Sequence, residues 1–153
     1  MWRIARDSKV LDLNSSYSYL LLSKQFSRTC VVAEHDGQVV GFATAYRLPD
    51  DPSVLFLWQV AVDASARGQG LALSLMKWLL SQDVCRDVTA FETTVTPSNA
   101  PSTALFHALT RELQSSLDIS PYFGEDDFPD AGHEAENLFH IGPFDVSVLG
   151  GRS

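Results

Sequence analysis

The sequence predicts one α/β domain with a mixed β-sheet and helices on both faces. The main observation is the order of the elements, in which a hairpin and a central apolar strand are followed by helices that alternate with strands. An Asp-Gly pair at positions 36–37 joins two β-rich runs, which is a strong signal for an antiparallel hairpin. The 153 residues are enough for one domain with a real core, and no internal linker or repeat divides them.

The chain opens with two predicted helices. Apolar residues recur near a 3.6-residue period over residues 2–10, and the pattern loosens around Asp12. The apolar residues of this first helix are Trp2, Ile4, Ala5 and Val10. Asn14 or Ser15 can cap a second helix, because either side chain accepts a hydrogen bond from the first turn. Its apolar face is predicted to hold Tyr19, Leu20, Leu22 and Phe26.

Strands and helices alternate through the middle of the chain. Residues 54–63 form a near-continuous apolar run, which predicts a central strand buried on both faces. A helix is predicted over residues 70–82, and a further strand over residues 88–96. The inward residues of that helix are predicted to be Leu71, Leu75, Trp78 and Leu79. Ser98 or Asn99 caps the next helix, with Pro101 in its first turn, where proline is tolerated.

The C-terminal part has weaker signals after Ser115. We predict a long polar and aromatic loop over residues 120–137 and a last strand over residues 138–144. A loop of that length inside a compact domain is usually functional or mobile.

Composition limits the partners and the compartment. The net charge of −8 and the pI near 4.7 disfavour nucleic acid and anionic membranes, which require clustered Lys and Arg. This charge suits a small cationic substrate, although solubility alone accounts for it equally well. Cys30 and Cys85 are too few for a disulfide framework and are interpreted as buried thiols of a reducing cytosol. With no membrane-length apolar run and no leader pattern, we expect a cytoplasmic protein.

The stretch "WQVAVDASARGQGLA", residues 58–72, takes an apolar strand through glycines into a helix. A Walker loop is excluded because no Lys follows Gly70, and a dinucleotide fingerprint matches only in part because Leu73 stands where a third glycine belongs. The pattern Arg/Gln-x-x-Gly-x-Gly/Ala is met by Arg67, Gly70 and Ala72. Backbone N–H groups and the helix dipole then converge on a pyrophosphate. A plain strand-to-helix turn is the alternative.

This turn, the apolar strand before it and the segment "NAPSTALF" at residues 99–106 together resemble the GNAT superfamily of acyl-CoA-dependent N-acetyltransferases. The resemblance implies a mixed, mostly antiparallel sheet whose central strand pair is splayed. It implies acetyl-CoA as cosubstrate, with the pantetheine arm against the backbone near Val60 and Val62. The acetyl-CoA contacts that it implies are Val60, Ala61, Val62, Arg67, Gly68, Gln69, Gly70, Leu71, Ala72, Asn99, Ser102 and Phe106.

Further segments, among them "LDLNSSYSYLLL", "ETTVTPSN" and "HEAENLFHIGPF", are similar to the diaminobutyrate acetyltransferases of ectoine biosynthesis, an osmoprotection pathway. This resemblance implies acetylation of the side-chain (γ) amine of L-2,4-diaminobutyrate, and a homodimer. Two departures affect what is expected. Residues 1–10 contain no candidate for the usual first edge strand, so we expect one domain over residues 1–153 without it. Many relatives have Tyr where Phe106 stands, so here the leaving thiolate must take its proton elsewhere or leave unprotonated.

The amine must lose a proton to attack the thioester, so a carboxylate base is expected. We predict Glu92, in the strand over residues 88–96, because a charge in the middle of a buried strand is costly unless it is used. The alternative is a glutamate near a strand end that reaches solvent. By analogy with the superfamily, a backbone N–H near Val60 stabilises the oxyanion. Neither cysteine has an apparent activating partner, so direct attack in a ternary complex is expected.

A substrate with two amines and one carboxylate requires acidic groups, hydroxyl donors and an aromatic wall. The candidate substrate contacts are Asp12, Asn14, Tyr17, Trp58, Glu92, Thr93, Thr94, His133, Glu134 and Glu136. Each has an ordinary structural alternative: helix entry for Asp12, packing for the aromatic residues, β-propensity for the threonines and surface ion pairs for residues 133–136. The segment "HEAE" lacks the second His of a zinc-protease motif, so no metal is expected.

Three other functions remain open at this point. The same fold can acetylate another small amine, such as a polyamine or an amino acid. The chain can also be an acyl-CoA-binding module without catalysis, or an interaction domain that uses residues 120–137.

Overall fold

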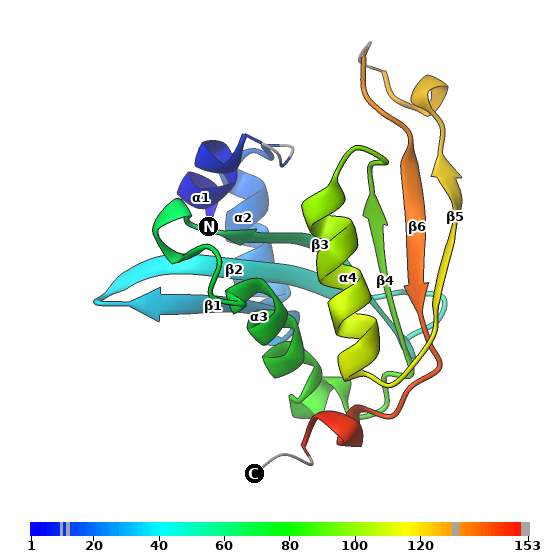
Figure 1. Cartoon of the computed structure of the whole chain (residues 1–153). Helices are drawn as coiled ribbons and strands as arrows, with labels where there is room; N and C mark the ends of the chain where they lie inside the picture. Colours follow the sequence, from blue (N-terminus) through cyan, green and yellow to red (C-terminus); the bar gives the residue numbers. More distant parts are fainter. Residues whose placement is uncertain (10, 12, 130–131, 151–153) are drawn as a thin grey trace.

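The computed structural model describes residues 1–150 except positions 10, 12, 130 and 131. Within these residues six strands form one sheet in the order β1-β2-β3-β4-β6-β5 (Figure 1). Their bounds are Cys30–His35 (β1), Gln38–Arg47 (β2), Val54–Val62 (β3), Ala90–Val95 (β4), Leu117–Phe123 (β5) and Glu136–Ile141 (β6). Every neighbouring pair is antiparallel except β3 and β4, which are parallel. The predicted mixed, mostly antiparallel sheet is confirmed.

Helices cover both faces of this sheet, as predicted. Helices α1 (Trp2–Ser8) and α2 (Ser16–Gln25) lie on one face, and α3 (Leu71–Leu80) and α4 (Ala100–Glu112) lie on the other (Figure 1). Side chains along β2 alternate between the two layers, because successive residues of a strand point to opposite faces. Phe42 packs with Tyr19 of α2, whereas the adjacent Ala43 belongs to the larger core with α3 and α4.

The structure shows the predicted hairpin turn and decides which of two candidate residues caps each of two helices. The hairpin between β1 and β2 turns at Asp36 and Gly37, both with positive φ, as a tight hairpin of this kind requires. Ser15, rather than Asn14, caps α2 by accepting from the backbone N–H of Ser18. Asn99, rather than Ser98, caps α4 by accepting from Ser102 N–H at 3.1 Å.

The central strands part as predicted for a splayed pair. β3 and β4 are paired only through Val54–Phe56 and Ala90–Glu92, although β3 runs on to Val62. Immediately past the last pair, the Thr93 hydroxyl donates to the backbone oxygen of Leu57 at 3.0 Å and bridges the strands where they begin to separate. The gap beyond this bond is where the candidate site lies.

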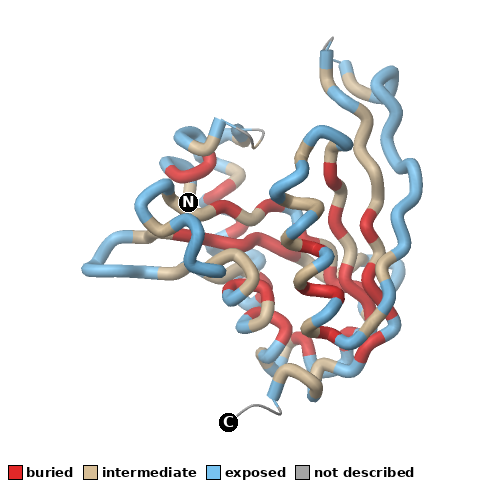
Figure 2. Tube along the Cα trace, in the orientation of Figure 1, coloured by how far each residue is buried: buried red, intermediate tan, exposed pale blue. Residues whose placement is uncertain are grey.

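The C-terminal prediction was wrong in one respect. Residues 120–137 were expected to be a loop, but residues 117–123 form the edge strand β5, and β6 starts at Glu136, two residues before the predicted strand. β5 is exposed along nearly its whole length (Figure 2). An edge strand with little to bury has no alternation of apolar and polar residues, and Pro121 further weakened the strand signal.

Three predicted inward side chains point outward instead. Trp78 is 54% exposed, because α3 turns Leu75, Met76, Leu79 and Leu80 to the core. On α2, Leu20 and Phe26 are also exposed, and the buried residues are Tyr19 and Leu22. On α1, Ile4 and Ala5 are buried as predicted, Trp2 is partly exposed beneath the guanidinium of Arg6, and Val10 lies outside the described residues.

Candidate active site

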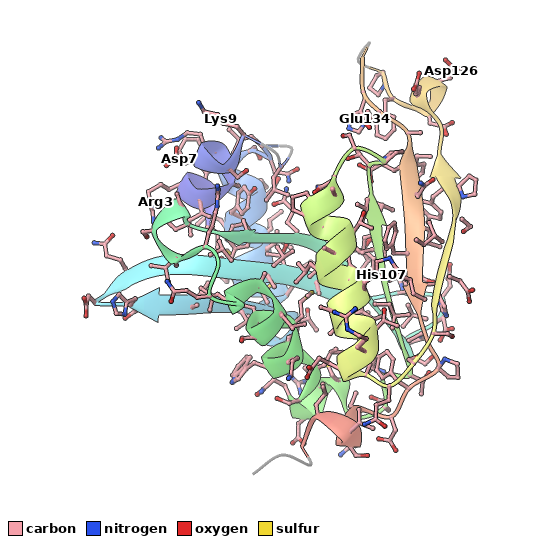
Figure 3. The ribbon with its side chains drawn as sticks, viewed as in Figure 1. Arg3, Asp7, Lys9, His107, Asp126 and Glu134 are labelled. Carbon is pink, nitrogen blue, oxygen red and sulfur yellow. The ribbon has the colours of Figure 1, made fainter. Side chains whose placement is uncertain are left out.

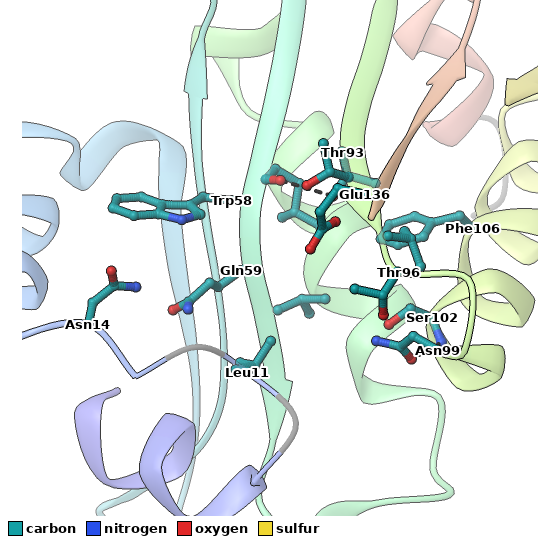
Figure 4. Close-up of a pocket in the computed structure, with 14 residues that line it drawn as sticks. Leu11, Asn14, Trp58, Gln59, Thr93, Thr96, Asn99, Ser102, Phe106 and Glu136 are labelled. Carbon is teal, nitrogen blue, oxygen red and sulfur yellow. Dashed lines mark hydrogen bonds between the residues drawn. The ribbon is translucent and has the colours of Figure 1, made fainter. Parts of the chain in front are cut away.

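A cleft opens where β3 and β4 part, and residues from four elements and two loops line it (Figure 4). Its volume is about 230 Å³, below the range of roughly 300–1,000 Å³ typical of drug-sized ligands, which suits a smaller molecule. The lining residues are Leu11, Asn14, Leu57, Trp58, Gln59, Val60, Thr93, Thr94, Val95, Thr96, Asn99, Ser102, Phe106 and Glu136.

A β-bulge shapes one wall of the cleft. Thr44 of β2 is opposite Gln59, but the next residue, Ala45, is opposite Leu57, so Trp58 is an extra residue in β3. Bulges redirect side chains beside active sites. Here Trp58 is 44% exposed, while Gln59 is buried and its Oε1 accepts from the Tyr19 hydroxyl at 2.9 Å. Gln59 was not among the residues predicted from the sequence, although a lone glutamine in an apolar strand is a signal that pointed to it.

The backbone beyond the bulge faces the gap. Asp63 N–H donates to Val40 O at 2.7 Å, and antiparallel ladders alternate between bonded and non-bonded pairs. In this register the non-bonded positions fall on Val60 and Val62, so their N–H and C=O groups point away from β2 and toward β4. No described residue of β4 beyond Glu92 pairs with β3 there. The predicted backbone contacts are therefore in position to receive an amide-bearing chain.

The glycine turn lies at the other end of the same groove. A second cavity of about 430 Å³ shares Val60 and Asn99 with the cleft and reaches Arg67 and Ala72 of the turn. Gly68 and Gly70 both have φ above +70°, a conformation that disfavours any side chain. Gly70 caps α3, so the N–H groups of the first helical turn lack intrahelical partners, and Ala72 of that turn lines the second cavity.

Glu136 is the only carboxylate among the described residues that line the cleft. Figure 4 shows its side chain reaching into the space between Trp58 and Gln59 on one side and Thr96 on the other. The early start of β6 puts it there, because Glu136 is the first residue of that strand. Thr96 and Leu11 also line the cleft and were missed by the sequence analysis.

The structure does not bring Glu92 into the cleft. Its side chain is only 16% exposed, and Oε1 lies 2.8 Å from Nδ1 of His140, its cross-strand neighbour on β6. It is neither at a strand end nor unpaired, so the neighbouring strand accounts for the buried charge. The position of Glu92 within the strand could not say which part of the sheet the cleft would reach.

The predicted threonine, asparagine and phenylalanine contacts have different surroundings. Thr94 lines the cleft, but the buried Thr93 already donates its hydroxyl to Leu57 O. Asn14 lines the cleft opposite β4. Phe106 also lines it and is buried, with ring centroids 6.2 Å from Phe91 and 6.0 Å from Phe139. Its hydroxyl-free ring therefore also packs in the core.

The remaining predicted substrate contacts lie apart from the cleft. Glu134 accepts hydrogen bonds from the backbone N–H and the hydroxyl of Ser98, and His133 stacks on Phe128 with 3.7 Å between ring centroids. Both line an adjoining cavity. Tyr17 is 66% exposed on α2 and is not among the described residues that line the cleft. Asp12 lies outside the described residues.

The two cysteines are unsuited to nucleophilic chemistry. Burial raises the pKa of the Cys85 thiol to about 11 and also raises the pKa of Cys30. Both thiols are therefore protonated at neutral pH, where a thiolate would be needed. Neither is part of a disulfide.

Comparison with known proteins identifies the family. The model of the acetyltransferase (GNAT) family matches residues 1–109. The chain belongs to the GNAT acetyltransferase family. Among its relatives, L-2,4-diaminobutyric acid acetyltransferase of Marinococcus halophilus is 47% identical. The match covers 94% of this chain and 83% of the length of that enzyme. The enzyme of that name from Streptomyces coelicolor is also 47% identical, over 94% and 85%.

A solved structure adds ligands to this comparison. Diaminobutyrate acetyltransferase EctA from Paenibacillus lautus, in complex with its substrate L-2,4-diaminobutyric acid and coenzyme A, is 46% identical with a TM-score of 0.90. The match covers 94% of the GNAT chain described here and 87% of that protein. The family resemblance stated from the sequence is thereby confirmed. In the described residues, no group of His, Cys, Asp or Glu side chains is placed to hold a metal ion. No described helix is long and apolar enough to cross a membrane.

Proposed function

We propose that this chain transfers the acetyl group of acetyl-CoA to the γ-amine of L-2,4-diaminobutyrate, which gives the N-γ-acetyl product used in ectoine biosynthesis. The observation that carries the proposal is the 46% identical relative with diaminobutyric acid and coenzyme A bound, matched over 94% of this chain. Two cavities that share Val60, Asn99 and Ser102 connect the glycine turn with the splayed strands.

The groove fits the acetyl carrier. The free N–H groups at the start of α3 suit a diphosphate, and no acidic residue occurs in residues 64–73 to repel it. The backbone groups of Val60 and the N–H of Val62 suit the amides of the pantetheine arm, whereas the carbonyl of Val62 already accepts from Arg67 Nε. Asn99 and Ser102 border both cavities along this path. Acetyl-CoA supplies a thioester carbonyl at the parting of the strands, and the N–H of Val60 faces the charge that develops on its oxygen.

The cleft fits the amine. A primary amine with a pKa near 10.4 is almost fully protonated at pH 7, so it needs a proton acceptor before it can attack. Glu136 is the carboxylate in position to accept that proton, directly or through one water, and we assign it the role first predicted for Glu92. Attack is direct, because both thiols are held in the protonated form.

The proposal is tested by steady-state kinetics on four amines with acetyl-CoA as donor. Diaminobutyrate should give the highest kcat/KM, with ornithine, lysine and putrescine well below it, and mass spectrometry should place the acetyl group on the γ-nitrogen. Equal or faster turnover of another amine would point instead to a GNAT enzyme with a different acceptor. Binding of acetyl-CoA without turnover of any of the four would favour a non-catalytic acyl-CoA module.

We further propose that the protein acts as a cytoplasmic homodimer in osmoprotection, with neither nucleic acid nor membrane as partner. The unpaired edge of β5 and the exposed Tyr17 and Leu20 on α2 support pairing with a second copy. The two free thiols suit a reducing compartment. Light scattering after size exclusion should give twice the mass of 16.8 kDa, and a monomer would contradict the dimer.

A further inference from the structure

A network of hydrogen bonds outside the cleft joins the glycine turn to α1. Asp63 directly follows β3 and begins the turn that leads to Gly70. Its Oδ1 accepts from the backbone N–H of Ser65 at 3.1 Å and from the Ser65 hydroxyl at 2.8 Å. Its Oδ2 accepts from Nη1 of Arg3 at 2.6 Å. One oxygen of the Asp63 carboxylate thus accepts hydrogen bonds from within the turn, and the other accepts from α1, which is distant in sequence.

Arg3 is itself held firmly against the sheet. Its Nη2 donates to the backbone oxygen of Val39 at 2.9 Å, and the next two residues, Ile4 and Ala5, are buried in the core with Phe42. Figure 3 shows the Arg3 side chain directed from α1 toward the turn after β3. Burial anchors α1, and two hydrogen bonds hold the half-exposed guanidinium of Arg3 between β2 and the turn.

The rest of the turn has little else to define it. At its start, Ala66 N–H donates to Asp63 O at 2.9 Å, and Arg67 Nε donates to Val62 O at 3.2 Å. A Cβ placed on Gly68 or Gly70 would meet no atom within 4 Å, so both glycines face open space on that side. Among these hydrogen bonds of the turn, only the one between Asp63 and Arg3 reaches another helix.

We propose that Asp63, through its ion pair with Arg3, is a positioning residue that presets the turn for the diphosphate of acetyl-CoA. This inference rests on the proposed function, since it concerns the same carrier. A turn that is already ordered loses less conformational entropy when the ligand binds, which favours affinity. Arg3 also offsets the negative charge of Asp63, which would otherwise repel a diphosphate.

The test is calorimetric titration of coenzyme A into the full chain and its variants. Asp63→Asn keeps an oxygen for Ser65 but loses the ion pair, whereas Asp63→Ala loses both. Since capping and surface ion-pair losses are each modest, we expect affinity to fall about threefold in Asp63→Asn and about tenfold in Asp63→Ala. In kinetics, KM for acetyl-CoA should rise while kcat and KM for the amine stay unchanged.

Three comparisons make this outcome specific. Asp87→Asn is the matched control, because Asp87 pairs with Arg47 at 2.8 Å far from the turn, and its loss should leave coenzyme A binding unchanged. Arg3→Gln should weaken binding in the parent chain but not in Asp63→Asn. Arg3→Lys should restore part of what Arg3→Gln loses, because the positive charge is kept. Thermal unfolding of each variant checks that it is folded.

The possible failures are distinguishable. Unaltered coenzyme A affinity in Asp63→Ala, with a parent chain that binds, would overturn the role of Asp63 alone. Equal weakening by Asp87→Asn would show a general effect of charge and would also overturn it. A parent chain with no affinity for coenzyme A would overturn the proposed function as well. If Asp63→Ala does not fold, the coenzyme A affinities of Asp63→Asn, Arg3→Gln and Arg3→Lys still decide whether Asp63 positions the turn.

Discussion

At the residue scale, the chemistry depends on which carboxylate meets the amine. Glu136 lines the cleft, whereas Glu92 is turned to His140. A base raises the rate only where it can reach the proton, so the position of a carboxylate decides between the two candidates rather than its burial.

Asp63 shows a different use of a carboxylate. Arg3 and Ser65 lower its pKa to about 2, so the pair is formed above its unperturbed pKa of 3.8 and lost as the pH falls toward 2.

Glu136→Gln is expected to lower kcat about 10²–10⁴-fold at pH 7, because the amine then has to be free base before it binds productively. The deficit should shrink as the pH approaches the amine pKa of about 10.4, since the free base then forms without help. A pH–rate profile of the variant beside the parent chain measures this. Glu92→Gln is the matched control and should keep most of kcat. A larger loss in Glu92→Gln than in Glu136→Gln would return the role of base to Glu92.

At the element scale, the structure explains what could be predicted from the sequence. The hairpin turn, the helix caps and the glycine turn were predictable because each depends on a few adjacent residues with special conformations. β5 was not, because an exposed edge strand needs no alternating pattern. The bulge at Trp58 was not, because it exists only as a mismatch between β2 and β3. The position of Glu136 depended on where β6 starts, and strand ends are poorly marked in a sequence.

The contact between α2 and the bulge gives a prediction for two elements. The buried Tyr19 hydroxyl donates to Oε1 of Gln59, which lines the cleft. Tyr19→Phe should lower the free energy of unfolding by about 1 kcal/mol, the usual net value of such a bond, and should raise KM for the amine. Urea unfolding and kinetics measure the two effects. Gln25→Ala, at an exposed position of the same helix, is the control and should change neither. Equal stability of Tyr19→Phe and the parent chain would contradict a role for this bond.

At the scale of the whole molecule, charge is distributed unevenly. Residues 113–150 contain eight of the nineteen acidic residues and no Lys or Arg, so the excess negative charge belongs to the part of the chain that forms β5 and β6. These strands project beyond the rest of the sheet beside the loop between β4 and α4 (Figure 1). A one-sided negative field of this kind raises the local concentration of a cationic amine near the cleft. It has the opposite effect on the anionic acetyl carrier.

This asymmetry predicts opposite salt dependences for the two substrates. Raising the ionic strength from about 0.01 to about 0.3 M shortens the Debye length from roughly 30 Å to less than 8 Å, so kcat/KM for the diamine should fall while kcat changes little. Under the same conditions kcat/KM for acetyl-CoA should stay the same or rise.

Two charge-neutralising variants test where the charge acts. Glu125→Gln together with Asp126→Asn, in the segment between β5 and β6, should make kcat/KM for the diamine less dependent on salt. The same number of charges removed elsewhere, as Asp36→Asn and Asp50→Asn, should reduce this dependence less, because both exposed side chains lie outside residues 113–150. Equal effects of the two pairs would show that net charge alone, and not its placement, attracts the amine.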